Sequence, residues 1–159
     1  MTMTAEARAL ASPLRLRILR ICLHEPRTNK EIALALGMNP GSTLHHVRTL
    51  VKTGFLHAEE PRRGKRGARE VPYLATKRSW DTSVPGIGPI LIQTFLDEVA
   101  DVAPDELGVI RLGLKLSDDD MKQLMQRITE LLVEFKEKPS SPDGEPVSVF
   151  VAMHPDRSA

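Results

Sequence analysis

The residues best suited to chemistry lie in two short stretches of the first half of the chain. The first stretch, residues 42–48, offers hydrogen-bond donors and acceptors at helical spacing, from Ser42, His45, His46 and Arg48. The second stretch, residues 60–70, contains five cations around two glycines. Side chains of this kind can contact base edges in a DNA groove, and clustered cations can contact phosphates.

Charge is divided unevenly between the two halves of the chain. Residues 1–80 contain 15 Lys and Arg against 6 Asp and Glu, whereas residues 81–159 contain 7 against 15. The net charge of +1 therefore conceals a basic half and an acidic half. This asymmetry favours a polyanion as the partner of the basic half, and a charge split without any partner is the alternative.

Composition limits the class of protein further. The 159 residues are 41% hydrophobic and 27% charged, as expected of a globular chain with a buried core. One cysteine, Cys22, cannot form an internal disulfide. We find no apolar run near the roughly 20 residues that span a bilayer, and no signal peptide at the start. We expect a cytoplasmic protein with no membrane partner.

Apolar spacing and capping residues predict three helices, at 13–23, 30–36 and 42–52. The second of these begins with a capping box, Thr28 with Glu31, and ends at Gly37. Strands are expected at 55–59 and 71–76, on either side of the basic segment 60–70. Because Pro72 lacks an N–H donor, the second strand is predicted at the edge of its sheet.

Two short helices joined by a tight turn containing Gly41 are the layout of a helix-turn-helix, here followed by a basic hairpin, or wing. Residues 9–19, ALASPLRLRIL, resemble the opening signature of ArsR-type bacterial transcriptional regulators. Residues 39–50, NPGSTLHHVRTL, and 52–56, KTGFL, resemble their recognition helix and the turn into the wing. The resemblance covers residues 5–80. It implies a dimeric regulator that binds an imperfect palindrome.

Contacts with DNA are predicted from three places: the start of the first helix-turn-helix element, the recognition helix and the wing. Thr43 is expected in the core rather than at the interface. His46 has an alternative role, packed against the helices, because it lies nearer the buried side than His45. The full predicted set is Thr28, Asn29, Lys30, Gly41, Ser42, His45, His46, Arg48, Arg62, Arg63, Lys65, Arg66 and Arg69.

The proline- and glycine-rich stretch 84–89 is the predicted domain boundary. The predicted fold class is α+β, with a winged helix-turn-helix domain at 5–80 and a small α/β domain, helix-strand-helix-strand, at 87–154. Its strands are predicted at 110–116 and 147–153. Their apolar faces exceed what one helix covers, so we expect a homodimer with Ile90, Leu91, Phe95, Leu131 and Phe135 in its interface. Dimerisation through the first helix is the alternative.

No metal, cofactor or catalytic role is expected. Cys22 alone cannot supply a thiolate site, the helix 121–138 has no histidine, and no phosphate loop or nucleophile motif is present. The predicted function is that of a homodimeric repressor, not an enzyme, on a palindromic site in double-stranded DNA. The alternatives are a nonspecific architectural DNA binder and a protein-interaction module that uses the acidic half. A small-molecule effector is a further predicted partner, without an identity.

Overall fold

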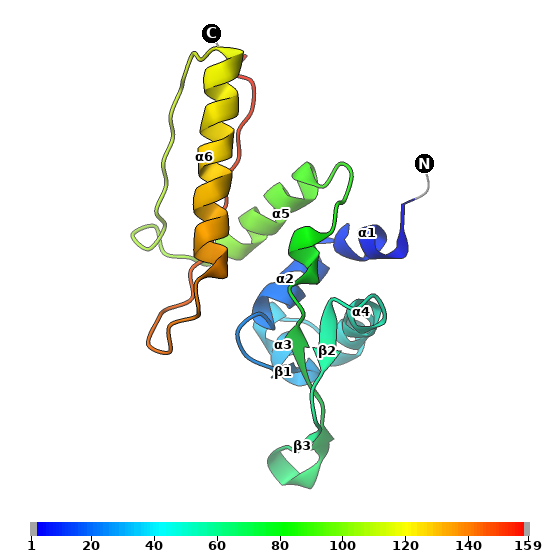
Figure 1. Ribbon diagram of the computed structural model, residues 1–159. Helices are drawn as coiled ribbons and strands as arrows, with labels where there is room; N and C mark the ends of the chain where they lie inside the picture. Colours follow the sequence, from blue (N-terminus) through cyan, green and yellow to red (C-terminus); the bar gives the residue numbers. More distant parts are fainter. Residues whose placement is uncertain (1–2, 158–159) are drawn as a thin grey trace. The chain divides into compact units, whose positions relative to one another are not determined.

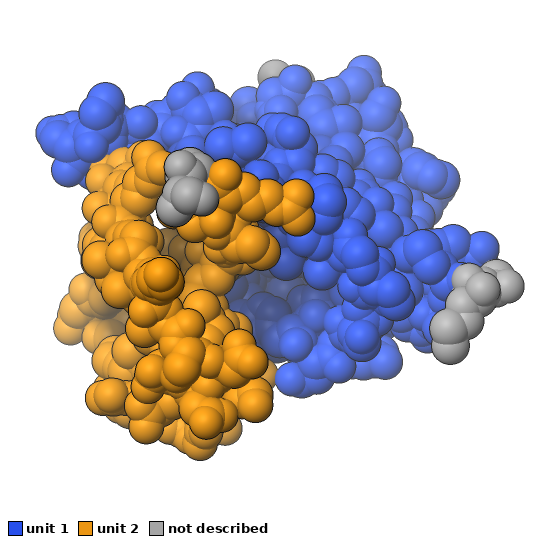
Figure 2. Space-filling model, turned by 90° about the horizontal axis from the view of Figure 1, so that it is seen from above, with its two compact units in different colours: residues 1–106 blue, residues 107–159 orange. Residues whose placement is uncertain are grey.

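The computed structural model of the chain describes residues 3–157, apart from the side chain of Arg66 (Figure 1). The chain divides into two compact units, residues 1–106 and 107–159, which Figure 2 shows in different colours. The first unit thus extends beyond the proline- and glycine-rich stretch and includes a helix that the sequence analysis assigned to the second domain. Each unit is described by itself below.

Four helices form most of the first 52 residues: α1 (Ala5–Leu10), α2 (Pro13–Ile21), α3 (Asn29–Leu36) and α4 (Pro40–Lys52). The last three confirm the predicted helices, and α4 begins at Pro40, two residues before the predicted start. The six residues of α1 were not predicted as a helix, because an apolar period cannot develop over so few positions. As expected, Gly37 ends α3 in the left-handed conformation, with φ of 62°.

A three-stranded antiparallel sheet follows, in the order β1-β5-β2, built from β1 (Arg27–Thr28), β2 (Leu56–Ala58) and β5 (Pro72–Ala75). The prediction that Pro72 places its strand at the edge is wrong, since β5 lies in the centre of the sheet. Pro72 is the first residue of β5, where a missing donor interrupts no ladder. Its carbonyl oxygen accepts a hydrogen bond from the N–H of Glu59, at 2.9 Å.

The wing connects β2 to β5 and has its own two-stranded ladder (Figure 1). Its strands are β3 (Arg62–Arg63) and β4 (Arg69–Glu70), paired antiparallel, with one turn of 3-10 helix, η1 (Lys65–Gly67), between them. The predicted basic hairpin is confirmed.

One hydrophobic core holds these elements together. The inner side of α4 consists of Thr43, Val47 and Leu50, each fully buried, in the predicted i, i+4, i+7 spacing. The core also includes residues of α2, α3, β2 and the turn before it: Ile18, Leu19, Cys22, Ile32, Phe55 and Leu56.

Two further helices of the first unit follow the sheet, η2 (Arg78–Asp81) and α5 (Gly88–Val99). The helix predicted from residue 90 is confirmed as α5, and it packs against α2. The guanidinium of Arg20 on α2 lies 3.6 Å from the Glu98 carboxylate on α5. Leu91, Ile92 and Leu96 lie on the exposed side of α5.

The second unit contains one long helix, α6 (Asp118–Glu137), which confirms the predicted helix and its Ser117 cap. The predicted strands at 110–116 and 147–153 are wrong, because neither segment takes part in a ladder within residues 107–157. A strand needs a neighbour to receive its backbone hydrogen bonds, and in Figure 1 the two segments run on either side of α6. Their apolar side chains are therefore exposed, Ile110 to 96% and Val147 to 78%.

Neither α6 nor any other helix within residues 3–157 has the length and apolar character needed to cross a bilayer.

Candidate nucleic-acid interface

The outer side of α4 is the centre of the candidate interface. Because Thr43, Val47 and Leu50 face the core, the helical period places Ser42, His45 and Arg48 in solvent, and all three are exposed. The structure therefore brings these predicted contact residues onto one surface. They offer a hydroxyl, an imidazole and a guanidinium, the kinds of group that recognise base edges.

The start of α4 is held by two asparagines. The side-chain oxygen of Asn39 accepts a hydrogen bond from the N–H of Gly41 at 2.8 Å. The amide nitrogen of Asn29, the first residue of α3, donates to the carbonyl oxygen of Pro40 at 2.8 Å. The first bond caps α4 and the second joins α3 to α4, at the end where Gly41 and Ser42 are exposed. A helix start of this kind presents backbone N–H groups and a positive dipole end, which suit a phosphate.

The predicted contacts at the start of α3 separate into two groups. Thr28 is buried and its hydroxyl oxygen accepts from the N–H of Glu31 at 3.3 Å, so it caps the helix. Asn29 is half-buried and occupied with Pro40. Only Lys30 carries its charge into solvent. Thr28 and Asn29 therefore support the structure of the interface, whereas Lys30 lies on its surface.

His46 is half-buried, and its Nδ1 has no hydrogen-bond partner among the described residues. Burial lowers the pKa of His46 below its usual value of 6.5, with smaller contributions from the nearby cation Arg15 and from His45. The ring centres of His45 and His46 are 5.6 Å apart, in an edge-on arrangement. This position favours the packing role for His46 and leaves His45 as the histidine on the outer surface.

The wing carries the densest group of exposed cations. Arg63, Lys65 and Arg69 are exposed and have no carboxylate partner among residues 3–157. Arg62 differs, because its Nη2 lies 3.1 Å from Oε1 of Glu31 on α3. For Arg66, whose side chain lies outside the described part of the structure, the predicted contact stays a prediction.

Two acidic residues near the interface escaped the sequence reasoning, Glu31 as an ion-pair partner and Glu70. Glu31 pairs with Arg62, and Oε1 of Glu70 lies 3.6 Å from Nζ of Lys30. The partners are 31 and 40 positions apart, so no local pattern could have revealed these pairs. The Thr28–Glu31 capping box was the only local signal.

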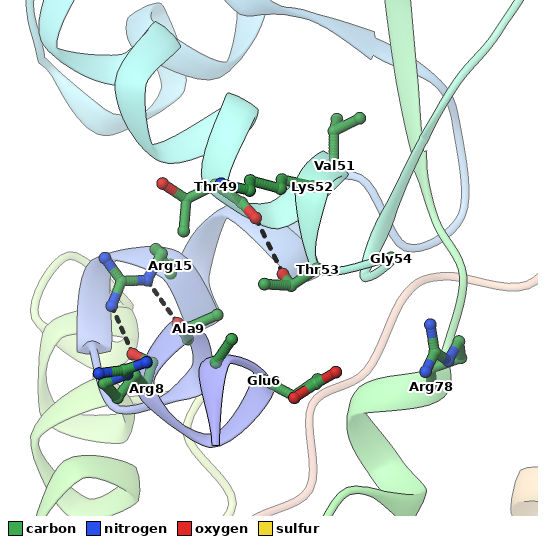
Figure 3. Close-up of a pocket in the computed structure, with 11 residues that line it drawn as sticks. Glu6, Arg8, Ala9, Arg15, Thr49, Val51, Lys52, Thr53, Gly54 and Arg78 are labelled. Carbon is green, nitrogen blue, oxygen red and sulfur yellow. Dashed lines mark hydrogen bonds between the residues drawn. The ribbon is translucent and has the colours of Figure 1, made fainter. Parts of the chain in front are cut away.

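A cavity of about 600 Å³ lies at the opposite end of α4, between α1, the end of α4 and Arg78 (Figure 3). Arg15 donates to the carbonyl oxygens of Ala9 and Arg8, the latter at 2.7 Å, so its charge stabilises the carboxyl end of α1. The guanidinium of Arg78 lies against Gly54, just beyond the last turn of α4. Arg15 therefore has a structural role at the end of α1.

No cluster of three or more His, Cys, Asp or Glu side chains within residues 3–157 is arranged to hold a metal ion. Burial raises the pKa of the Cys22 thiol to about 12, so it carries no charge at neutral pH. Cys22 is a core residue.

The three-helix arrangement, the small sheet and the exposed basic hairpin define a winged helix-turn-helix domain in residues 5–75. Residues 12–58 match the family described as "Bacterial regulatory protein, arsR family". This segment, from the cap of α2 to the end of β2, is therefore an ArsR-family helix-turn-helix, a DNA-binding domain of transcriptional regulators.

Several solved structures are similar to this chain. A fragment of a "possible transcriptional regulatory protein" from Mycobacterium bovis is 23% identical, with a TM-score of 0.39, over 60% of this chain and 86% of that one. RV1404 from Mycobacterium tuberculosis is 18% identical over 86% of each chain, with a TM-score of 0.38. MarR is 18% identical over 77% of this chain and 74% of that one, with a TM-score of 0.37. Likeness at this level supports no conclusion about function. No curated protein matches the chain.

The lowered pKa of His46 predicts a pH dependence of stability. Because the unfolded chain has the higher pKa, near 6.5, it binds more protons than the folded chain when the pH falls through this range. The contribution of neutral His46 is complete above about pH 6.5 and is lost as the pH falls through the folded-state pKa. We expect His46→Gln to flatten this loss in urea unfolding between about pH 5 and pH 8.

His57→Gln, which removes an exposed histidine from β2, is the matched control for that measurement. An equally steep loss of stability in the wild type and in His46→Gln would contradict the assigned environment of His46.

Proposed function

We propose that the chain is a cytoplasmic, sequence-specific transcriptional regulator, a homodimeric repressor that places one α4 helix in each half of a palindromic DNA site. The observation that supports this most directly is the outer side of α4, where Ser42, His45 and Arg48 are exposed opposite a buried apolar side. A recognition helix enters the major groove with such residues near its N-terminus.

The parts of the interface divide the work between affinity and specificity. Gly41 at the start of α4, Lys30 and the wing cations contact phosphates, which supplies binding that does not depend on sequence. Ser42, His45 and Arg48 contact base edges, which supplies preference for one site over others. Repression follows when a bound dimer occupies DNA that the transcription machinery needs.

The dimer is proposed from the apolar surface that one chain leaves uncovered. The exposed side of α5 contains Leu91, which is 39% exposed, and α6 exposes Leu131 to 55% and Phe135 to 59%. No residue between 107 and 157 is buried, so this unit lacks a core of its own. A second copy would cover these side chains and would hold two recognition helices about one DNA turn, roughly 34 Å, apart.

Two members of the predicted interface, Ile90 and Phe95, are already half-buried within one chain, so they contribute less surface. The small-molecule effector stays a prediction.

The first test concerns phosphate contacts by the wing. Replacing Arg63, Lys65 and Arg69 together with Gln should weaken binding to all duplexes and should flatten the salt dependence by about one unit of slope per lost contact. Fluorescence anisotropy at several salt concentrations measures both effects. The matched control replaces Arg111, Lys115 and Arg127 of the second unit, which changes the net charge equally. An equal change of slope in both triple variants would contradict a wing contact.

The second test concerns base recognition. Ser42→Ala or His45→Ala should relax the preference at one position of each half-site, at a cost of about 1–3 kcal/mol in discrimination. Competition between a selected duplex and single-base variants of it measures this preference. Lys52→Ala, at the other end of α4, is the control.

Equal losses on selected and random duplexes would show that these side chains position the protein without reading sequence. A wild-type chain that binds selected and random duplexes equally would be an architectural DNA binder.

The third test concerns the dimer. Leu91→Glu and Leu131→Glu should each shift the protein to monomer in sedimentation velocity, because a charge in a buried apolar interface loses its hydration. Leu34→Glu, on the exposed side of α3, is the control and should leave the dimer intact. Circular dichroism shows whether each variant is folded. Persistence of the dimer in both interface variants would favour association through α2, the first of the predicted helices.

A further inference from the structure

The wing has no apolar side chains with which to hold its position. Between residues 59 and 70 the only apolar side chains are Pro61 and Ala68, and both are exposed. The ladder between β3 and β4 has two residues in each strand. Isolated two-stranded ribbons are marginal in water, so some other interaction must orient this hairpin relative to the helices.

Two ion pairs join the wing to the start of α3. Glu31 accepts two hydrogen bonds from Nη2 of Arg62 on β3, at 3.1 and 3.2 Å from its two oxygens. Lys30, the preceding residue of α3, lies 3.6 Å from the carboxylate of Glu70 on β4. Arg62 and Glu70 are themselves opposite each other in the β3–β4 ladder. Adjacent residues of α3 with opposite charges thus contact both strands of the wing, an arrangement that we name the wing clasp.

The carboxylate of Glu31 is also held by the helix cap, and the carboxylate of Glu70 lies close to a glycine. Oε2 of Glu31 accepts from the N–H of Thr28 at 2.7 Å, the second half of the capping box. This bond is the main reason that the pKa of Glu31 lies below its usual range, and the charge of Arg62 adds to it. The side chain of Glu70 lies on the backbone of Gly64, where any Cβ would overlap the carboxylate. Glycine at position 64 therefore leaves room for this carboxylate in the place that it occupies in the second ion pair.

We propose that Glu31 and Glu70 are positioning residues for DNA binding, which hold the wing at a fixed place relative to the recognition helix. This inference rests on the proposed function. Since Asn29 joins the start of α3 to Pro40, the wing clasp connects the wing to the start of α4 through one short helix. A wing ordered in advance loses less conformational entropy when it binds, so affinity rises without a new contact to DNA.

The opposite expectation follows from charge alone. A carboxylate next to a phosphate-binding surface repels DNA, and its removal should tighten binding. Partly exposed ion pairs also contribute little to stability, typically less than about 1 kcal/mol. The sign of the change in DNA affinity therefore separates the two accounts.

The test compares Glu31→Gln and Glu70→Gln with Glu25→Gln. Glutamine keeps the size of Glu31 and can serve at the same position of a capping box, so the helix cap survives while the charge is lost. Glu25 pairs with Arg27 at 2.9 Å and has no contact with Arg62 or Lys30 among the ion pairs of the described residues, and its variant changes the net charge equally. The probe is a duplex selected from a random pool, or a random-sequence duplex if none is enriched.

We expect both clasp variants to bind more weakly than the wild type, by up to about fivefold, the upper limit for one lost exposed ion pair. Glu25→Gln should bind as tightly as the wild type or slightly more tightly. In an Arg62→Gln background, Glu31→Gln should have no further effect, because its partner is already missing. Tighter or unchanged binding by Glu31→Gln and Glu70→Gln would overturn the proposal.

A measurement on the free protein separates this proposal from the proposed function. NMR relaxation of the backbone amides of Gly64 and Gly67 should show greater motion on the fast timescale in Glu31→Gln than in the wild type or in Glu25→Gln. If the wild type fails to bind DNA, the proposed function is wrong, and the amide relaxation still decides whether the wing clasp orders the wing. Unchanged relaxation in Glu31→Gln would show that it does not.

Discussion

The burial of one side of α4 is the constraint on which the rest of the interface depends. Thr43, Val47 and Leu50 have no exposed surface, and burying an aliphatic side chain such as Val47 or Leu50 contributes roughly 1.5–3 kcal/mol. Rotating the helix by half a turn would lose this burial for several residues at once. The core therefore decides that Ser42 and His45 face solvent. The chemistry of the outer side depends on packing that no nucleic acid touches.

The short helix α3 connects α4 to the wing. Its first residue, Asn29, donates to the backbone at Pro40, and its next two, Lys30 and Glu31, contact the two strands of the wing. Three consecutive side chains thus connect the start of α4 with both strands of the wing. The first turn of α3 therefore connects the charged parts of the candidate interface.

The sequence predicts elements well where the signals are local. The caps at Ser12 and Ser117 and the capping box at Thr28 lie within three residues of the groups they bond, and each helix they open is present. Features that depend on partners far apart in the chain could not be predicted from the sequence. The apolar alternation at 110–116 predicted a strand that has no neighbour for a ladder, and the pair between Arg62 and Glu31 spans 31 positions.

The central position of β5 also could not be predicted from its proline. A proline within a strand interrupts the ladder, whereas a proline at the first residue, such as Pro72, does not. For the interface, residue types and helical phase were enough to place Ser42, His45 and Arg48 outside and Thr43 inside. They could not show that the side chain of Asn29 is bonded to Pro40, whereas the cap formed by Thr28 was itself predicted.

Amide chemical shifts on addition of DNA test the central claim most directly, namely that the outer side of α4 and the wing form the nucleic-acid surface. In a titration of the ¹⁵N-labelled full-length protein with a short duplex, the largest changes should occur at Gly41, Ser42 and His45 and in the wing from Arg63 to Arg69. Amides of α6 should change little, because no DNA contact is proposed for residues 107–159. Largest changes in α6 or in residues 107–117, with α4 unaffected, would contradict the account.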